Sequence, residues 1–387
     1  MSDQANITLP RIMKVGAGAS GELASTLRAL DLARPLLVTD PHILACGYCE
    51  RLQSQLDAAG IPWGLFAECV PDPTTDSVYA ALEVLLSGGH DCVVGLGGGS
   101  SIDTAKAVAV LASGGGPMRD YKAPVQTDRG LPIIAIPTTA GTGSEATRVA
   151  VITDTETSEK MLCMGLGLMP LAALVDYELT LSMPFRLTAD TGIDSLCHAL
   201  EAYVSRRANP FTDSVALTAM ATIYKNIRTA CYEPDNRDAR AAMMLAATQG
   251  GMAFANASVT LIHGMSRPIG ALFHVPHGLG NAMLLPVVTA WSVHGSPARY
   301  AVCARAMGMA DAADSDPAAL EKLVQGLREL NADLAVPGPA AWGIDTTQWF
   351  DSLPLMAQQA LDSGSPANNP RLADAADIIA LYERAWE

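Results

Sequence analysis

The sequence predicts an α/β N-terminal domain with a parallel sheet, followed by an all-α C-terminal domain. Before Pro184, short strand-like runs alternate with helix-like segments of about ten or more residues, a pattern typical of βαβ units. After Pro184 the strand-like runs stop, and Ala, Leu and Met-rich segments with helical periodicity continue along the chain. We therefore expect one domain over residues 1–181 and a second over residues 182–387.

The elements of the first domain follow one another in order. Its strands are expected at residues 36–39, 92–96, 133–136 and 173–175, and its helices at residues 43–59, 76–86 and 101–111. In the second domain the clearest helices are expected at residues 212–227 and 237–255. Residues 363–370, rich in Pro, Asn and Ser, predict a loop before a final helix.

Composition excludes several classes of partner. The 387 residues carry a formal net charge of −15, which argues against binding to nucleic acid or to an anionic membrane surface. Any anionic substrate therefore needs a cationic group beside it. No stretch approaches the ~20 apolar residues of a membrane span, and the polar start from Met1 to Gln4 lacks the features of a secretory leader. We expect a cytoplasmic protein.

The eight cysteines stand mostly inside apolar runs, which favours reduced, buried thiols over a disulfide framework. Cys46 and Cys49 do form a CxxC pattern, for which a redox dithiol is the alternative interpretation. A redox dithiol normally lies at the start of a helix, where its thiolate is stabilised. Because Pro41 is the expected helix opener, both cysteines fall further inside the helix, and we favour a structural role.

Two glycine loops are candidates for binding a phosphate. Residues 16–21 match GxGxxG and are followed by Asp40 at the end of an apolar strand, but the strand before this loop is short and poor. The second loop, Gly97-Gly98-Gly99-Ser100-Ser101, follows a clean strand and leads into a helix. Consecutive glycines let backbone N–H groups approach a pyrophosphate, and the helix N-terminus adds its positive dipole end. We prefer the second loop; the alternative is that its glycines only permit a tight turn.

A third loop, at residues 137–145, follows the strand expected at 133–136. It supplies small hydroxyls and flexible backbone at the carboxyl end of a parallel strand, where open α/β sheets bind ligands. The alternative is an ordinary turn.

Histidines and one aspartate indicate a metal site in the second domain. Asp194 and His198 are four residues apart and share one helix face. Three of the seven histidines of the chain fall within residues 263–277, and His263 and His277 have apolar, glycine-rich flanks. One carboxylate and three imidazoles suit a borderline divalent ion such as Fe²⁺ or Zn²⁺. The alternatives are a surface ion pair and core histidines bonded to backbone.

These motifs, in this order, resemble those of the iron-containing (group III) alcohol dehydrogenase family. The resemblance rests on residues 97–106, on residues 137–145, on Asp194-xxx-His198 with Glu201, and on residues 263–278. It covers nearly the whole chain and implies a dehydroquinate-synthase-like fold. It also implies that residues 1–181 bind a dinucleotide, that residues 182–387 bind metal and substrate, and that the protein is a homodimer or a larger homo-oligomer.

The resemblance further implies the cofactors NAD and Fe²⁺, or Zn²⁺, and a set of site residues. The implied metal ligands are Asp194, His198, His263 and His277. The implied cofactor-binding residues are Gly97, Gly98, Gly99 and Ser100 at the pyrophosphate, Thr138, Thr139, Thr142 and Ser144 along the nucleotide, Asp40 at the adenosine ribose, and Asp103 and Lys160 near the nicotinamide. A carboxylate at Asp40 accepts from a ribose 2′-OH and repels a 2′-phosphate, so we expect NAD(H) rather than NADP(H).

One position departs from the family pattern. Relatives often carry a histidine, thought to help move protons, four residues after His263, whereas this chain has Arg267. Arginine cannot act as a base at neutral pH. We hypothesise that Arg267 receives an anionic group of the substrate, an ion pair with a nearby acid being the alternative, and that His274 carries the proton.

The sequence thus predicts a metal-dependent, NAD(H)-linked alcohol dehydrogenase or aldehyde reductase for small primary alcohols or aldehydes, including ones with an anionic group. The alternatives are a dedicated hydroxy-acid or semialdehyde dehydrogenase, a sugar-phosphate cyclase on the same fold, and a non-catalytic NAD-binding or filament-forming protein. A cyclase would need several cationic side chains gathered for a phosphate, and in the helical half only Arg267 is suitably placed.

Overall fold

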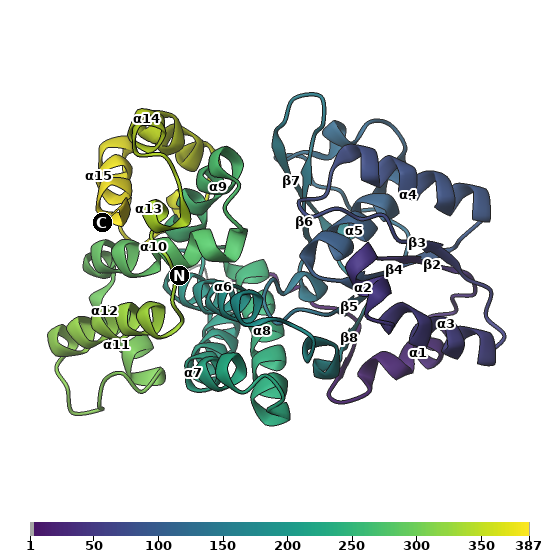
Figure 1. Ribbon diagram of the computed structural model, residues 1–387, viewed down its shortest axis with the longest axis horizontal. Helices are drawn as coiled ribbons and strands as arrows, with labels where there is room; N and C mark the ends of the chain where they lie inside the picture. Colours follow the sequence, from purple (N-terminus) through teal and green to yellow (C-terminus); the bar gives the residue numbers. More distant parts are fainter. Residues whose placement is uncertain (1–3, 387) are drawn as a thin grey trace. The chain divides into compact units, whose positions relative to one another are not determined.

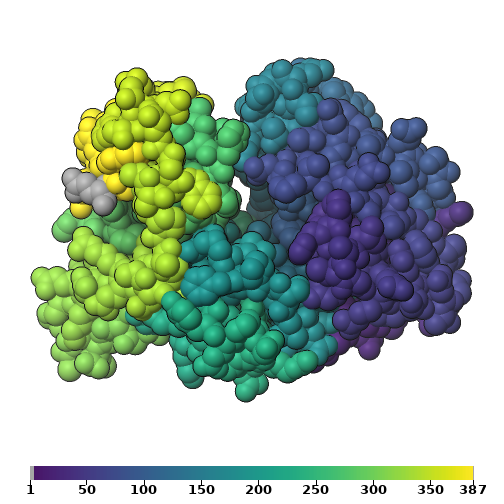
Figure 2. All heavy atoms as spheres, in the orientation of Figure 1, coloured from purple at the N-terminus to yellow at the C-terminus, as the bar shows by residue number. Residues whose placement is uncertain are grey.

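The computed structural model describes residues 4–386, so Met1 to Asp3 of the polar start lie outside the described residues. The chain forms two compact units. The α/β unit comprises Thr8–Met183, and the helical unit comprises Pro184–Glu387 with a short N-terminal segment that ends at Ile7. Figure 2 shows side chains filling each unit, purple to blue in the first and mainly teal to yellow in the second.

A parallel sheet forms the centre of the α/β unit, which confirms the predicted fold class (Figure 1). Six strands pair in the order β1-β8-β5-β4-β2-β3, all parallel. Their bounds are β1 Ile12–Val15, β2 Pro35–Val38, β3 Gly64–Phe66, β4 Cys92–Gly97, β5 Ile133–Pro137 and β8 Ala172–Val175. The sequence indicated only a short and poor strand before residues 16–21, where β1 lies, and it did not predict β3; both are short edge strands. A separate antiparallel hairpin, β6 Val149–Thr153 with β7 Lys160–Met164, was also missed.

Helices cover both faces of this sheet (Figure 1). Their bounds are α1 Leu23–Ala29, α2 Pro41–Ala45, α3 Tyr48–Ala58, α4 Thr75–Gly88 and α5 Gly99–Gly114. Side chains of β4 alternate between two cores: Val93 packs with α4 and α5, whereas Val94 and Leu96 pack with α1 and α3. This alternation, with period two, is what a strand buried on both faces requires.

The prediction of a single helix over residues 43–59 is wrong. The chain forms α2 and α3 instead, because Gly47 adopts a left-handed conformation with φ of 75° between them. Cys46 ends α2, and Cys49 is buried in the first turn of α3. All eight cysteines are free thiols, and burial raises the pKa of Cys49 to about 11. A thiol that stays protonated at neutral pH is a poor redox nucleophile, which favours the structural interpretation of the CxxC pattern.

The helical unit contains no strand among its described residues, as predicted. Its helices are α6 Phe185–Val204, α7 Pro210–Tyr232, α8 Arg237–Ala257, α9 Leu261–Phe273, α10 His277–Ser292, α11 Pro297–Ala306, α12 Asp316–Asp333, α13 Pro339–Trp342, α14 Thr346–Asp362 and α15 Ala375–Trp386. The first three pack side by side (Figure 1). A Cβ on Gly192 of α6 would lie 2.7 Å from Ile227 Cδ1 and 2.9 Å from Met243 Cε, so a larger residue here would have to displace the ends of these two side chains.

Membrane insertion finds no support in the described residues. None of their helices combines the length and the apolar character that crossing a bilayer requires.

A fully buried lysine, Lys106, links α5 to the segment that follows β5. Its Nζ donates to Ser144 Oγ at 2.9 Å, to Thr147 O and Oγ1 at 3.0 Å each, and to Val149 O at 2.7 Å. Asp103 of α5 stands 4.0 Å away. The ammonium group therefore holds the start of β6 and the 3-10 helix η3, Ser144–Ala146, against the first turns of α5.

Replacement of Lys106 by Met should destabilise the α/β unit. The substitution keeps the aliphatic stem but leaves four oxygen acceptors without their donor, so we expect the free energy of unfolding to fall by about 3 kcal/mol. Urea denaturation followed by circular dichroism measures the change. Lys122→Met is the matched control, because Lys122 is exposed and pairs only with the exposed Glu159. Equal stability of the two variants would contradict this account of Lys106.

Candidate functional site

Three helices of the helical unit bring the expected metal ligands together. The buried residues Asp194 and His198 lie on α6, His263 lies in the first turn of α9, and His277 is the first residue of α10. The residue after His277 makes this convergence possible. A Cβ on Gly278 would lie 2.5 Å from the backbone oxygen of Asp190, so only glycine lets α10 begin against α6.

Three imidazole nitrogens converge on one carboxylate oxygen. Oδ1 of Asp194 lies 3.4 Å from Nε2 of His263, 3.7 Å from Nε2 of His277 and 3.9 Å from Nε2 of His198. Ligand atoms of Asp194, His263 and His277 all lie within 4.8 Å of one another. Of the four side chains only that of His277 is substantially exposed, at 48 %. The cluster is therefore buried except on the side of His277, where a small molecule can approach.

The ring of His198 is held by stacking. It lies between the ring of Phe254, with centroids 4.2 Å apart, and the ring of His263, with centroids 4.6 Å apart. Its Nδ1 is buried and has no hydrogen-bond partner among the described residues. Packing against two rings thus fixes the direction of Nε2 without help from a hydrogen bond.

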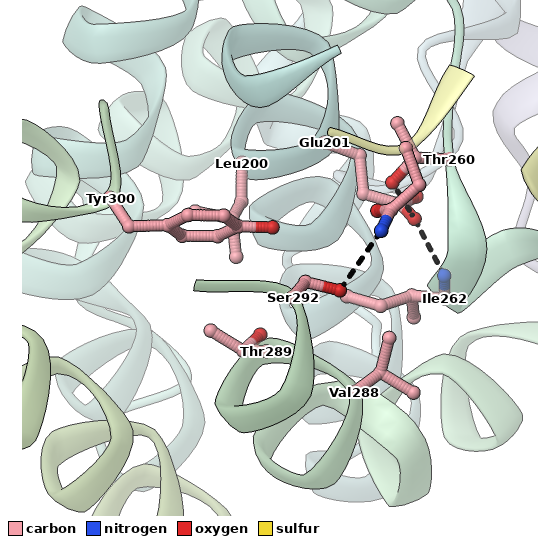
Figure 3. Close-up of a pocket in the computed structure, with 9 residues that line it drawn as sticks. Leu200, Glu201, Thr260, Ile262, Val288, Thr289, Ser292 and Tyr300 are labelled. Atoms are coloured by element: carbon pink, nitrogen blue, oxygen red, sulfur yellow. Dashed lines mark hydrogen bonds between the residues drawn. The ribbon is translucent and has the colours of Figure 1, made fainter. Parts of the chain in front are cut away.

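Glu201, one turn after His198 on α6, controls the orientation of His263. Its Oε2 accepts from Nδ1 of His263, and its Oε1 accepts from Thr260 Oγ1 at 2.8 Å and from Ile262 N at 2.7 Å (Figure 3). The same carboxylate therefore satisfies N–H groups at the start of α9 and the ring N–H of His263 on that helix. A partner on Nδ1 leaves Nε2 free to act as a ligand.

Figure 3 also shows the pocket behind Glu201, lined by Tyr300, Thr289, Ser292 and neighbouring side chains. Asn369 donates to Ser292 Oγ across it at 3.1 Å. The pocket lies on the far side of Glu201 from the histidine cluster, and it offers no room for a substrate. Its lining side chains support Glu201 from behind.

Asn281, one turn after His277 on α10, is a further helix-borne group at the cluster. Its Nδ2 donates to Asp194 Oδ1 at 2.6 Å and lies 3.1 Å from Nε2 of His263 and 3.3 Å from Nε2 of His277. Asn281 is completely buried. The sequence analysis did not single out Asn281 or assign a role to Glu201, although their spacings on the helix faces of His277 and His198 are a signal that points to both.

The charges of the cluster are unevenly shared. Burial lowers the pKa of His198 to about 4, so this ring is neutral at pH 7. The pKa of His263 rises to about 9, because Glu201 and Asp194 outweigh its burial. Burial acts to raise the pKa of Asp194, but the three histidines hold it well below its ordinary value. The two carboxylates thus create a local demand for positive charge.

This donor set fits a divalent ion. One carboxylate oxygen and three imidazole nitrogens from rigid helices, with a carboxylate behind one ring, are what Fe²⁺ or Zn²⁺ accepts. An ion bound there also supplies the positive charge that Asp194 and Glu201 require. The structure thus places the four predicted ligand residues together, and their role in binding metal belongs to the proposal below.

In the α/β unit, the second glycine loop leads directly from β4 into α5. Gly97 has φ of 149°, and a Cβ there would lie 2.5 Å from Ser101 Oγ, so this position requires glycine. A Cβ on Gly99 would lie 3.0 Å from Thr142 Cγ2, and the nearest atom to one on Gly98 would be Cγ2 of Thr139, at 3.5 Å. Side chains of the protein thus pack closely against Gly97 and Gly99. No side chain caps α5 at Gly98, so the first N–H groups of this helix can bind an anion.

The remaining predicted residues of this loop region also lie together. Thr138 donates its backbone N–H to Gly97 O at 2.9 Å, and Ser144 Oγ donates to Asp103 Oδ1 at 2.7 Å. Ser100 lies in the first turn of α5. The predicted residues Gly97, Gly98, Gly99, Ser100, Asp103, Thr138, Thr139, Thr142 and Ser144 thus share the ends of β4 and β5 and the first turns of α5.

Asp40 follows β2, beside the second glycine loop. Its Oδ1 accepts from Ile43 N at 2.9 Å and caps α2, and its Oδ2 accepts from Ser101 Oγ at 3.2 Å. These contacts fix the carboxylate at the carboxyl end of the sheet. Each oxygen keeps a lone pair for a further donor.

The first glycine loop, which was the less favoured candidate, is already occupied by the protein. Gly18 N donates to Asp176 Oδ1 at 3.1 Å, and Ser20 donates through N and Oγ to Asp176 Oδ2 at 3.2 and 2.6 Å. Asp176 is completely buried. An internal carboxylate thus takes the place that a phosphate would have, which favours the loop at residues 97–101 for the nucleotide.

Three predicted residues lie apart from these groups or have no contact with them. Lys160 begins β7 and pairs with Asp72 at 3.0 Å. His274 is exposed and ends α9 in a left-handed conformation with φ of 54°. Arg267 lies on α9, four residues after His263, and makes no hydrogen bond or ion pair with any described residue. The roles predicted for all three remain predictions.

A parallel sheet with a glycine loop at the start of a helix, and a buried cluster of one carboxylate and three imidazoles, are features that a metal-dependent enzyme using a nucleotide requires. Comparison with known proteins narrows this class. The family model for iron-containing alcohol dehydrogenase matches residues 10–177, and the model for the C-terminal part of the same family matches residues 188–386. The chain belongs to the iron-containing alcohol dehydrogenase family, as the motifs predicted.

Individual relatives agree with this assignment. The chain is 34 % identical over 382 residues to the NAD-dependent methanol dehydrogenase of Bacillus methanolicus, covering 98 % of this chain and 99 % of that protein. The crystal structure of a 1,3-propanediol oxidoreductase matches with a TM-score of 0.95 at 33 % identity, covering 99 % and 100 % of the two chains. Sulfoacetaldehyde reductase from Bifidobacterium kashiwanohense, solved in complex with NAD⁺, matches with a TM-score of 0.90 at 27 % identity, covering 99 % of each chain.

Replacement of Glu201 by Gln should weaken metal binding. The amide retains an oxygen for the start of α9 but presents an N–H group to Nδ1 of His263, so we expect the dissociation constant for Fe²⁺ or Zn²⁺ to rise about 10-fold to 100-fold. Competition with a chromophoric chelator measures it. Glu233→Gln is the control, because Glu233 is an exposed residue in the same unit. Unchanged affinity in the Glu201 variant would contradict its orienting role.

Proposed function

We propose that this protein is a metal-dependent, NAD(H)-linked alcohol dehydrogenase and aldehyde reductase that acts on small primary alcohols or aldehydes. The observation that carries the proposal is the convergence of three imidazole Nε2 atoms on the carboxylate of Asp194. Family membership and the three relatives described above support it.

The helical unit binds and orients the substrate oxygen in this proposal. Asp194, His198, His263 and His277 hold a divalent ion, which supplies Lewis-acid polarisation of an alcohol or carbonyl oxygen when bound. Glu201 and Asn281 fix the directions of two of these ligands, so that the site is set before the substrate arrives. The exposed edge of His277 leaves the approach for a small molecule.

The α/β unit binds the nucleotide in this proposal. Gly97, Gly98, Gly99 and Ser100 receive the pyrophosphate at the N-terminus of α5, and the threonines that follow β5 line the rest of the nucleotide. The nicotinamide supplies the hydride acceptor or donor. We further propose Asp103 and Lys160 near its ring, and His274 as the group that carries the proton, on the family resemblance and on sequence position.

The rival function on the same fold, a sugar-phosphate cyclase, requires several free cationic groups at the metal. Among the described half-buried or buried arginines of the helical unit, only Arg267 lacks a partner. We further propose a homodimer or larger homo-oligomer, because the family resemblance implies it, and a cytoplasmic protein, as expected from the composition. Light scattering of the purified protein measures the assembly.

Removal of the metal should abolish the activity reversibly. We expect a chelator-treated protein to lose NADH-dependent reduction of small aldehydes by at least about 100-fold, because polarisation of the oxygen is worth several kcal/mol. Anaerobic addition of Fe²⁺, or of Zn²⁺, should restore it. Absorbance of NADH follows the reaction, and elemental analysis follows the metal. Full activity in protein shown to contain no metal would overturn the proposal.

Replacement of Asp40 by Asn should relax the preference for NAD(H). The amide oxygen still caps α2, but the negative charge is gone, and like charges ~4 Å apart repel by about 1 to 4 kcal/mol. We therefore expect the ratio of kcat/KM for NADP⁺ to that for NAD⁺ to rise roughly tenfold or more. Asp57→Asn, in the same unit and away from β2, is the control. If the ratio stays at its original value, Asp40 does not face the ribose.

A further inference from the structure

Arg267 differs from every comparable arginine of the helical unit. Six other arginines among its described residues are half-buried or buried, and each has a partner. Arg186, Arg228, Arg299 and Arg305 pair with aspartates, Arg240 donates to Thr188 and to a backbone oxygen, and Arg371 donates to a backbone oxygen. Arg267 is half-buried as well, yet it makes no hydrogen bond or ion pair within residues 4–386.

A half-buried guanidinium without a partner is costly, because burial removes water from a charge that arginine cannot lose. Burial lowers the pKa of Arg267, and Glu201 is the only acid that counteracts it. The Glu201 carboxylate is already committed to His263 and to the start of α9. The local structure therefore keeps a cation in place and leaves its five N–H donors unused by the protein.

The position of Arg267 points to the side of the metal ligands. His263 and Arg267 are four residues apart on α9, so they share one helix face, with Cβ atoms ~6 Å apart. Nε2 of His263 on that face is directed at Asp194. The next turn of α9 carries Gly270 and Ala271, which are too small to cover the guanidinium. Because Arg267 is only half-buried and shares the helix face of His263, we infer that an anion can reach it from the side on which a substrate oxygen would meet the metal ligands.

We propose that Arg267 binds the carboxylate of the substrate, so that the enzyme acts on short aldehyde acids and the corresponding hydroxy acids. This inference rests on the proposed function and deepens it by naming the substrate class. A spacing of ~6 Å between the two side-chain origins suits a substrate with roughly two or three carbons between the reacting carbon and the carboxylate. The planar guanidinium can donate two parallel hydrogen bonds to that carboxylate.

The overall charge of the protein makes such a cation necessary. With a formal net charge of −15, the chain repels anions at long range. A fixed arginine beside the site supplies a local attraction and also positions the reacting carbon, since two points of the substrate are then held. Neutral aldehydes of the same length lack the carboxylate through which Arg267 would hold the substrate.

The test compares two aldehydes of the same chain length, succinate semialdehyde and butanal. The variants are Arg267→Gln, which removes the charge, and Arg267→Lys, which keeps it. In Arg267→Gln we expect the ratio of kcat/KM for succinate semialdehyde to that for butanal to fall about 30-fold to 100-fold, mainly through KM. Arg267→Lys should recover part of the ratio. Arg228→Gln, which breaks an ion pair far along α7, should leave the ratio at the wild-type value.

A binding measurement separates this inference from the proposed function. Titration calorimetry with butyrate, which cannot react, should show binding to wild-type protein and binding at least about tenfold weaker to Arg267→Gln. If the wild-type protein reduces neither aldehyde but binds butyrate through Arg267, the proposed function fails and the anion site stands. If kcat/KM falls equally for the charged and the neutral aldehyde in Arg267→Gln, the anion site is refuted. It is also refuted if butyrate binds the wild-type protein and Arg267→Gln with the same affinity.

Discussion

The buried carboxylate of Asp194 is the charge on which the arrangement of the helical unit depends. A carboxylate inside a protein is tolerated only when donors and positive charge surround it. Asn281 donates to it, and three imidazoles converge on it. These groups come from α6, α9 and α10, so the three helices must approach closely, which explains the glycine at 278, where α10 begins against α6. The demands of one charge thus set the packing of these three helices.

Glu201 gives this cluster its asymmetry. It is the second carboxylate on the same face of α6, but it faces Nδ1 of His263, whereas Asp194 faces Nε2. His263 therefore lies between two negative groups and has a raised pKa, while His198, held between aromatic rings, has a lowered one. The proposed function separates two tasks by position: Asp194 would meet the ion directly, and Glu201 would fix the ring of His263 from behind. A single carboxylate could not do both, because its two oxygens would have to reach Nδ1 and Nε2 on opposite sides of the same imidazole ring.

Periodicity was enough to predict the parallel sheet and the helical half, whereas the grouping of Asp194, His198, His263 and His277 was predicted from the positions of the histidines together with the family resemblance. Sequence patterns failed to predict the features that depend on tertiary packing. Edge strands such as β1 gain their stability from one neighbour, so their sequence carries little of the apolar signal of a central strand such as β4. Lys106 resembles any helix-surface lysine in sequence, and only the loop folded over α5 shows that its ammonium group is buried. The use of Asp176 by the first glycine loop could not be predicted without knowing which distant segments meet.

A common principle distinguishes the groups that hold the fold from those left for ligands. In the first glycine loop, Asp176 supplies an internal anion, and the loop is closed. In the second, Gly98, Gly99 and Ser100 donate to no carboxylate among the described residues, although the same kind of backbone is present. The helical unit repeats the contrast, since Arg186 pairs with Asp190 whereas Arg267 has no acid within ion-pair distance among the described residues. A protein of strong negative charge has an excess of acidic side chains that could pair with its own cations and anion-binding loops. A cation or a loop of this kind that remains unpaired therefore indicates a site whose partner is a ligand.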